Sequence, residues 1–275
     1  MSTLAHNLAT GAILLLAAFL GANANSAVWY VDKDNTGTED GTSWATAFNT
    51  IQEGVNASSA AGGGEVWVAE GTYVGSSSPV LTMLANVDIF GGFSGNETAQ
   101  NQRDWKTHVT IIDGENARRC VNGANNAKID GFTMTKGYSP GDYTLGFGGA
   151  GMRIDSVSPT VNNCIFSNAY SGYGGGILCL NSSMATIRNC IFTGNVTSYG
   201  GGICILASTS ITVENCLFVN NNGAGGSIYN STSSSAMVNC TVMGNTSTIG
   251  AAFYNYSGSS TLKNCILWNN TTSEA

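Results

Sequence analysis

The sequence predicts an all-β solenoid of stacked coils of about 25 residues each, and three observations predict it. A fifteen-residue phrase occurs twice, as NCIFSNAYSGYGGGI from Asn163 and as NCIFTGNVTSYGGGI from Asn189. Each period contains short β-branched or aromatic runs between Gly, Asn and Ser, and no segment of helical length. The chain has only 3 prolines, as expected where strands donate hydrogen bonds to neighbours on both sides. A propeller blade needs more residues than this period contains, which argues against a propeller. The period fits one coil of a parallel β-helix.

An Asn-Cys pair marks each regular coil. This column consists of Asn163, Cys164, Asn189, Cys190, Asn215, Cys216, Asn239, Cys240, Asn264 and Cys265, with the cysteines at intervals of 26, 26, 24 and 25 residues. Coils stack about 4.8 Å apart, so equivalent residues form ladders. We expect Arg188 to point outward, Asn189 to make a bend, and Cys190 and Phe192 to point inward. Gly131 occupies the same slot as Asn189, and Asn and Gly are the residues that best tolerate left-handed backbone angles.

The 8 cysteines are expected to be mainly a packing feature. Side chains stacked on parallel rungs point the same way, which suits packing more than the angle that a disulfide requires. Buried cysteine behaves as a small hydrophobic residue. A ladder of free thiols is therefore our first expectation, and isolated bridges between adjacent rungs are the second. Cys179 and Cys204 are offset by one place relative to their Gly triplets, so we expect them to face opposite sides of the strand.

The N-terminus, residues 1–24, is predicted to be a secretory signal peptide. An apolar run from Gly11 to Leu20 is followed by Ala22-Asn23-Ala24, a typical cleavage site. The run is too short for a transmembrane anchor. We expect a secreted or cell-surface protein whose mature chain does not insert into a membrane.

Residues 25–64 are predicted to form a strand and a helix that caps the first rung, since an open solenoid end exposes core and strand edges. The apolar face of this helix is formed by Trp44, Phe48, Ile51 and Val55. We expect the helix to run from Ser43 to about Ala60, with Thr42 or Ser43 as its cap. Irregular first coils then occupy 65–127, and regular coils occupy 128–275.

The chain stops shortly after the last motif, in NCILWNNTTSEA. Two expectations stay open: the chain is a piece of a longer protein, or a partner covers its last rung. The net charge of −7 and the pI of about 4.6 argue against nucleic acid or an anionic membrane as partner.

The repeats resemble a known group of proteins. GGGI combined with F-x-x-N, as in Phe192 to Asn195 and Phe218 to Asn221, resembles the repeats of chlamydial polymorphic membrane proteins. The stretch WYVDKDNTGTEDGTSWATAF, with GGFSGNE and NQRDW, is similar to bacterial surface proteins of the right-handed parallel β-helix type. The resemblance implies a right-handed coil and a role as an adhesin, passenger or surface structural protein. The wider fold includes polysaccharide lyases and hydrolases.

Few residues carry recognisable chemistry. His108 is the only histidine after the signal, which argues against a His-based triad or a multi-His zinc site. Asp142, Arg153 and Asp155 form the nearest approach to a catalytic constellation, with solvated loop and strand positions as the alternative.

A second weak pattern is the stretch DKDNTGTEDG, which resembles part of a calcium loop. Its possible ligands are Asp32, Asp34, Glu39 and Asp40, but Ser43 stands where the final acid is expected. The alternative is an acidic turn ahead of a helix. Calcium is the only cofactor that the sequence suggests.

An apolar stripe is predicted on one outer face of the regular coils. Its members are Leu178, Leu180, Cys204, Leu206, Tyr229, Tyr254 and Tyr256, which point outward if Ile203 points inward. Exposed apolar patches usually mark interaction sites, so we expect self-association or docking through this face or the end rung. The alternative is that loops or a missing segment cover the stripe.

Two functions follow from these patterns. The first is a secreted or cell-surface, non-enzymatic β-helix with a structural or adhesive role, whose partners are itself, other surface proteins or glycans. The alternative is a carbohydrate-active enzyme, a polysaccharide lyase or hydrolase, with its site on the early coils.

Overall fold

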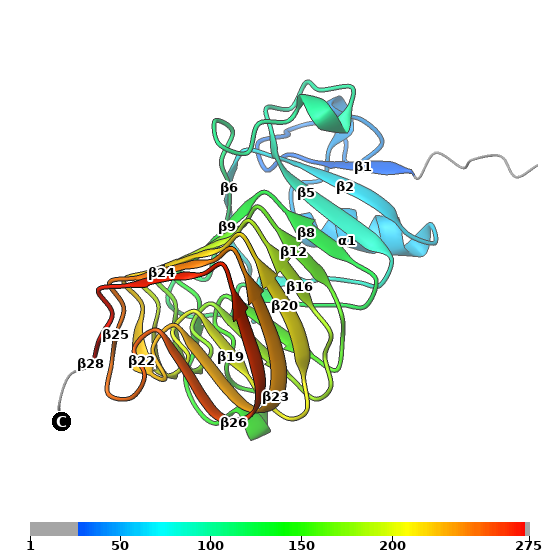
Figure 1. The fold of residues 1–275 in the computed structure, drawn as a ribbon. Coiled ribbons are helices and arrows are strands. Elements are labelled where there is room, and N and C mark those ends of the chain that lie inside the picture. Colours follow the sequence, from blue (N-terminus) through cyan, green and yellow to red (C-terminus); the bar gives the residue numbers. More distant parts are fainter. Residues whose placement is uncertain (1–26, 273–275) are drawn as a thin grey trace, which may run out of the picture.

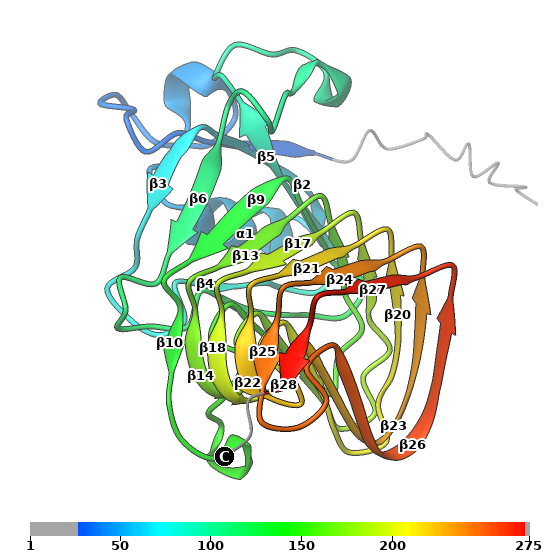
Figure 2. The same cartoon turned by 60° about the vertical axis from the view of Figure 1, so that its left-hand side comes forward.

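The computed structural model describes residues 27–272, which form a parallel β-solenoid with one α-helix at its N-terminal end (Figure 1). The predicted signal peptide lies outside the described residues. Three parallel sheets run along the solenoid, and Figure 2 shows how successive rungs stack in each.

The first sheet has 14 strands and folds back on itself, because β23 and β26 are long enough to continue from one limb into the other. Its strands are β1 (Val28–Val31), β2 (Gly64–Ala69), β5 (Val87–Phe93), β8 (Lys128–Asp130), β12 (Thr160–Asn162), β16 (Thr186–Arg188), β20 (Ser210–Glu214), β23 (Ile228–Val238), β26 (Phe253–Lys263), β19 (Ile203–Ile205), β15 (Ile177–Leu180), β11 (Met152–Asp155), β7 (Val121–Asn122) and β4 (Leu81–Thr82).

The second and third sheets have 8 and 6 strands. The second sheet contains β3 (Gly71–Tyr73), β6 (Thr110–Asp113), β9 (Phe132–Thr135), β13 (Ile165–Ser167), β17 (Ile191–Thr193), β21 (Leu217–Val219), β24 (Thr241–Met243) and β27 (Ile266–Trp268). The third contains β10 (Tyr138–Ser139), β14 (Tyr170–Tyr173), β18 (Val196–Tyr199), β22 (Asn222–Ala224), β25 (Thr246–Ser247) and β28 (Thr271–Thr272). The short 3-10 helices are η1 (Trp44–Thr46), η2 (Gln100–Gln102) and η3 (Tyr143–Leu145).

The core is a set of ladders. Phe166, Phe192 and Phe218 lie in register on β13, β17 and β21, and all three are fully buried. Four of the repeated cysteines are also buried, and the fifth, Cys265, is half-buried. The buried ones are Cys164, Cys190, Cys216 and Cys240. All eight cysteines are free thiols. Cys179 belongs to the main core and Cys204 to a separate cluster, so the two face opposite sides of their strands.

The bend between the first two sheets is made by one residue per rung. Asn163, Asn189, Asn215, Asn239 and Asn264 have φ values of 51°, 53°, 54°, 56° and 54°, and Gly131 has 82°. A left-handed residue turns the chain by one position at the bend. Asn189 itself stays on the surface, and the next residue, Cys190, points into the core.

A second asparagine ladder lies inside the solenoid, where the second sheet turns into the third. Asn195, Asn221 and Asn245 are fully buried. The Asn221 amide donates to the carbonyl of Phe192 at 2.9 Å and to Asn245 Oδ1 at 3.1 Å. Because each amide bonds both the backbone and the next rung, these polar groups are buried without losing their hydrogen bonds.

The capping helix is shorter than the predicted range from Ser43 to about Ala60. Helix α1 spans Ile51–Ala60, and its cap is Thr50, which forms a reciprocal capping box with Glu53. The predicted start at Ser43 is wrong, because the chain before Thr50 pairs with β1: the Phe48 amide donates to the carbonyl of Tyr30. Ile51 and Val55 do pack into the core, so α1 covers the first rung.

Candidate functional site

The four acids of the partial calcium loop do not converge. Asp34 pairs with Lys33, and Asp40 accepts hydrogen bonds from Thr42. Glu39 accepts hydrogen bonds from Asn49. Asp32 accepts from the backbone of Asp34. Within residues 27–272 no group of three or more His, Cys, Asp or Glu side chains is arranged to hold a metal ion.

The Asp142, Arg153 and Asp155 set is an ion pair and a helix cap. Arg153 Nη2 lies 2.8 Å from Asp155 Oδ2, whereas Asp142 caps η3 by accepting from the Thr144 amide. Burial alone would raise the pKa of Asp155, but hydrogen bonds from Asn181 and Arg153 and the charge of Arg153 hold it below its usual value. Asp155 therefore stays ionised. His108 Nδ1 lies 3.2 Å from Glu70 Oε2, away from this set.

The apolar stripe is in the predicted register, and the alternative that the sequence left open, that loops cover the stripe, holds for its leucine and cysteine members. Leu178, Cys204, Tyr229 and Tyr254 are direct neighbours on successive rungs. Leu178, Leu180, Cys204 and Leu206 are nevertheless buried in a second apolar cluster. Tyr229 and Tyr254 are half-buried, and Tyr256 remains 67% exposed.

The cover of this cluster is a tyrosine row together with the loop 140–149. Tyr143 from the loop contacts Tyr173, which stacks on Tyr199 with ring centroids 4.9 Å apart. Arg119 holds the loop by donating to the carbonyls of Gly146 and Gly148. A loop that folds back over its own coil is a long-range feature, and coil periodicity gives no sign of it.

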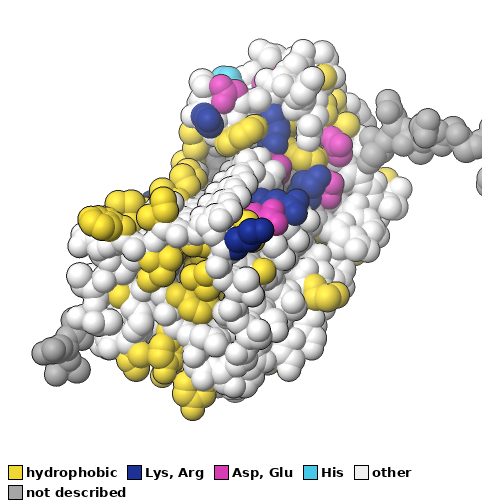
Figure 3. All heavy atoms as spheres, viewed as in Figure 1, with side chains coloured by type: hydrophobic (Ala, Val, Ile, Leu, Met, Phe, Trp, Pro, Cys, Tyr) yellow, Lys and Arg dark blue, Asp and Glu magenta, His cyan; other side chains and the backbone are white. Residues whose placement is uncertain are grey.

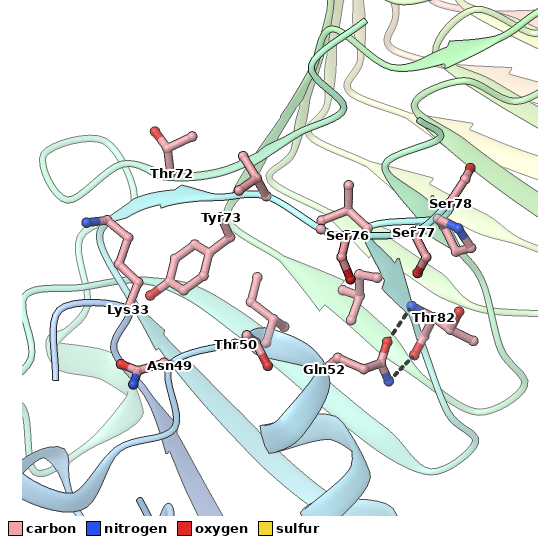
Figure 4. Close-up of a pocket in the computed structure, with 16 residues that line it drawn as sticks. Lys33, Asn49, Thr50, Gln52, Thr72, Tyr73, Ser76, Ser77, Ser78 and Thr82 are labelled. Carbon is pink, nitrogen blue, oxygen red and sulfur yellow. Dashed lines mark hydrogen bonds between the residues drawn. The ribbon is translucent and has the colours of Figure 1, made fainter. Parts of the chain in front are cut away.

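A cleft of about 530 Å³ opens beside the start of α1 (Figure 4). Hydroxyl groups from Thr50, Ser76 and Ser77 line it, and the apolar floor includes Val74. Gln52 closes one side, since its amide bonds both backbone groups of Thr82 at 2.8 and 3.1 Å. Among the residues that the structure describes, no charged residue other than the ion-paired Lys33 lines the cleft.

A second hollow of about 480 Å³ lies where the segment around Trp105 meets the bend between the first two sheets. Its lining includes Trp105, Val109, Asn163, Ile165 and Asn189. Trp105 is half-buried and Val109 is 40% exposed, so apolar surface is open to ligand here. No pattern in the sequence indicates this hollow, because the segment NQRDW forms it only through its position beside the bend.

The hollow continues into a track along the solenoid. We use the name bend track for the outward side chains of Asn163, Asn189, Asn215, Asn239 and Asn264 and of the neighbouring row Ile165, Ile191, Leu217, Thr241 and Ile266. Asn189 Nδ2 donates to Asn162 Oδ1 at 3.1 Å, and Asn215 Nδ2 donates to Asn189 Oδ1 at 3.3 Å. The amides therefore orient one another from rung to rung.

A buried ion pair ends the track at the hollow. Arg103 Nη2 lies 2.6 Å from Asp130 Oδ1, and the two side chains are only 7% and 6% exposed. The guanidinium lies over the rings of Phe90 and Trp105, 5.1 and 4.9 Å from their centroids. Gly131 occupies the bend position of this rung, because a Cβ there would meet Arg103 at 2.8 Å and Trp105 at 3.0 Å. The rung of β8 and β9 thus has the arginine and tryptophan pair where the later rungs have an asparagine.

Figure 3 shows this face as an uncharged band between a row of hydrophobic side chains and a row of interleaved basic and acidic ones. The charges belong to ion pairs on the first sheet. Arg188 Nε lies 2.7 Å from Glu214 Oε2, and Lys128 Nζ lies 3.4 Å from Asp88 Oδ2.

Comparison with known families agrees with this architecture. The family model described as right handed beta helix region matches residues 120–273. The match covers more than half of the chain, and the chain belongs to this family, so its coil is right-handed. The comparisons with curated proteins and with solved structures gave no match. Within residues 27–272, no helix has the length and apolar character needed to cross a membrane.

Proposed function

We propose that this chain is a secreted or cell-surface β-helix protein with a non-enzymatic, adhesive or structural role. The observation that carries the proposal is the bend track, which presents an amide on each of five successive rungs and an aliphatic side chain on four of them, with Thr241 on the other. A surface that repeats one set of contacts at each rung suits recognition of an extended ligand. A reaction centre needs one unique constellation instead.

The N-terminal sequence and the resemblance of the repeats support an extracellular role. Gly11–Leu20 with Ala22-Asn23-Ala24 is typical of a secretory signal. The repeats resemble those of chlamydial polymorphic membrane proteins, which supports a place at the cell surface. Fractionation of the native host and immunodetection of the chain test this part. Retention in the cytoplasm contradicts it.

A carbohydrate-active enzyme is the second candidate, because Arg153 and Asp155 line a hollow of about 370 Å³ with Asn122. The lowered pKa of Asp155 suits a base or nucleophile and does not suit a proton donor. The ion pair with Arg153 commits this carboxylate to a structural contact.

A screen for glycan binding and cleavage separates the two candidates. We expect bound glycans to be recovered intact. Formation of shorter products that stops in Asp155→Asn establishes the enzyme and removes the adhesive proposal.

We also propose self-association through the last described rung. Leu267 lies in register with the buried Val242, yet it is 45% exposed, and Trp268 beside it is 69% exposed. Leu267 is thus an exposed core position, whereas Trp268 lies in the outward row with Met243, and a large exposed apolar area of this kind favours association. Light scattering is expected to detect oligomers that dissociate in Trp268→Lys, with Tyr170→Lys on the third sheet as the control. A monomer at every concentration rules this part out.

A further inference from the structure

We propose that the bend track binds an extended, uncharged glycan that lies along the solenoid axis, with one sugar on Trp105. This inference rests on the proposed adhesive role and names its ligand class. The track offers three kinds of contact: the aromatic face of Trp105, amides such as that of Asn189, and aliphatic side chains such as Leu217.

Hydrogen bonding along the track has to come from side chains. Strands β13, β17 and β21 are each paired on both sides, so their backbone groups are used within the sheet. A peptide strand therefore has no free edge to join on this face. Asparagine amides both donate and accept, as sugar hydroxyls do. Asn163 Oδ1 and Asn215 Oδ1 accept no hydrogen bond from any described residue, and Asn163 is half-buried while Asn215 is exposed.

The spacing of the track suits a chain of sugar rings. Rungs repeat at about 4.8 Å, which is close to the length that one sugar adds to an extended glycan. Each rung offers one amide and one neighbouring side chain, which is Ile165, Ile191 or Leu217 on three consecutive rungs. These side chains are half-buried and present flat aliphatic surface for the C–H groups of a pyranose.

The charges on this face favour a neutral ligand. Arg103, Arg188 and Lys128 each pair with a carboxylate, and the Arg103 pair is buried. A polyuronate needs cations that are not already paired with carboxylates, and Lys106 is the one cation among the described residues that line the hollow. The net charge of −7 also repels a polyanion. An uncharged glycan meets none of these penalties.

Trp105 provides the anchoring platform. Its ring is held by Arg103, whose guanidinium lies 4.9 Å from the ring centroid. Arg103 is itself fixed by Asp130 and by the Gly91 carbonyl, so the ring keeps one orientation. A fixed aromatic ring loses little conformational entropy when a ligand stacks on it.

The test is an array of oligosaccharides that contains neutral β-linked hexose oligomers and matched oligouronates. The full-length chain is expected to bind neutral oligomers in preference to uronates, and binding should persist when salt is raised from about 0.01 M to about 1 M. Trp105→Ala and Asn189→Gly are each expected to weaken binding about tenfold or more. Glycine keeps the left-handed bend at position 189, so this variant removes the amide without straining the backbone. Tyr170→Ala, an exposed aromatic on the third sheet, is the matched control and should bind as wild type.

The outcomes separate this inference from the function on which it rests. Preference for uronates, full binding by both track variants, or binding to no neutral oligomer overturns the glycan inference. Beads coated with the protein would then be tested for adhesion to cells. If wild-type and Asn189→Gly beads adhere equally, the adhesive role still stands without the glycan inference. If wild-type beads do not adhere, both proposals are ruled out.

Discussion

Phe192 and Phe218 stack face to face across adjacent rungs, with ring centroids 4.6 Å apart and ring planes within 3° of parallel. Both rings are fully buried, and Phe166 continues the stack on the other side of Phe192 at 5.0 Å. Replacing Phe218 with alanine removes one member of a continuous column. We expect the free energy of unfolding to fall by about 3–5 kcal/mol, measured by urea denaturation.

The matched control for this variant is Val219→Ala, because Val219 is the next residue of β21 and points outward. It should cost under about 1 kcal/mol. Equal losses for Phe218→Ala and Val219→Ala would contradict the inward order of side chains on this strand.

The interior asparagine ladder should contribute to stability through hydrogen bonds. In Asn221→Ala, the carbonyl of Phe192 and the backbone amide of Asn195 lose their partner while remaining buried. We expect a loss of about 3 kcal/mol or more, since an unsatisfied buried polar group costs about 1–3 kcal/mol. Asn222→Ala, at an exposed position of β22, is the control and should be close to neutral. A neutral Asn221→Ala would show that water replaces the amide.

The free energy of unfolding should depend more on a buried ion pair than on an exposed one. Arg103→Met leaves Asp130 buried without its partner, and we expect a loss of about 3–5 kcal/mol. Arg188→Met breaks the half-exposed pair with Glu214 and should cost under about 1 kcal/mol. Thermal denaturation of the two variants gives the comparison. Similar melting temperatures would contradict the burial of the Arg103 pair.

Buried thiols should lower the free energy of unfolding as the pH rises through the alkaline range. Burial raises the pKa of Cys120 to about 12, whereas the ordinary value is 9.0. Between these values the unfolded thiol ionises and the folded thiol does not, so stability present below pH 9 is lost as the pH rises. Each such thiol contributes a slope of about 1.4 kcal/mol per pH unit. Under reducing conditions, Cys120→Ala should reduce this slope. An unchanged slope argues against a buried, neutral thiol.

The coil itself could be predicted from sequence, because its determinants are local and repeated. Asn189 and Cys190 recur once per coil, and the left-handed bend follows from residue type alone. The F-x-x-N pattern contains Asn195 and Asn221, but periodicity does not show that these polar side chains lie inside. That placement requires the hydrogen bonds between rungs.

Features that break the repeat could not be predicted in the same way. The loop 140–149 lies against Leu178 at Gly148, and Arg119 of the preceding coil holds the loop in place. The start of α1 depends on competition between the capping box at Thr50 and pairing of the preceding segment with β1. The position of Trp105 beside the bend likewise depends on the buried Arg103 pair.

Hydroxyl-radical footprinting with mass spectrometry tests the central claim most directly, because it reports which side chains a bound ligand covers. The purified chain would be oxidised with and without a saturating neutral oligosaccharide from the array. We predict that Trp105, Ile191 and Leu217 become protected while Tyr170 stays as reactive as before. Protection of Val74 in the cleft beside α1, with no change at Trp105, would contradict the assignment of the bend track as the ligand-binding surface.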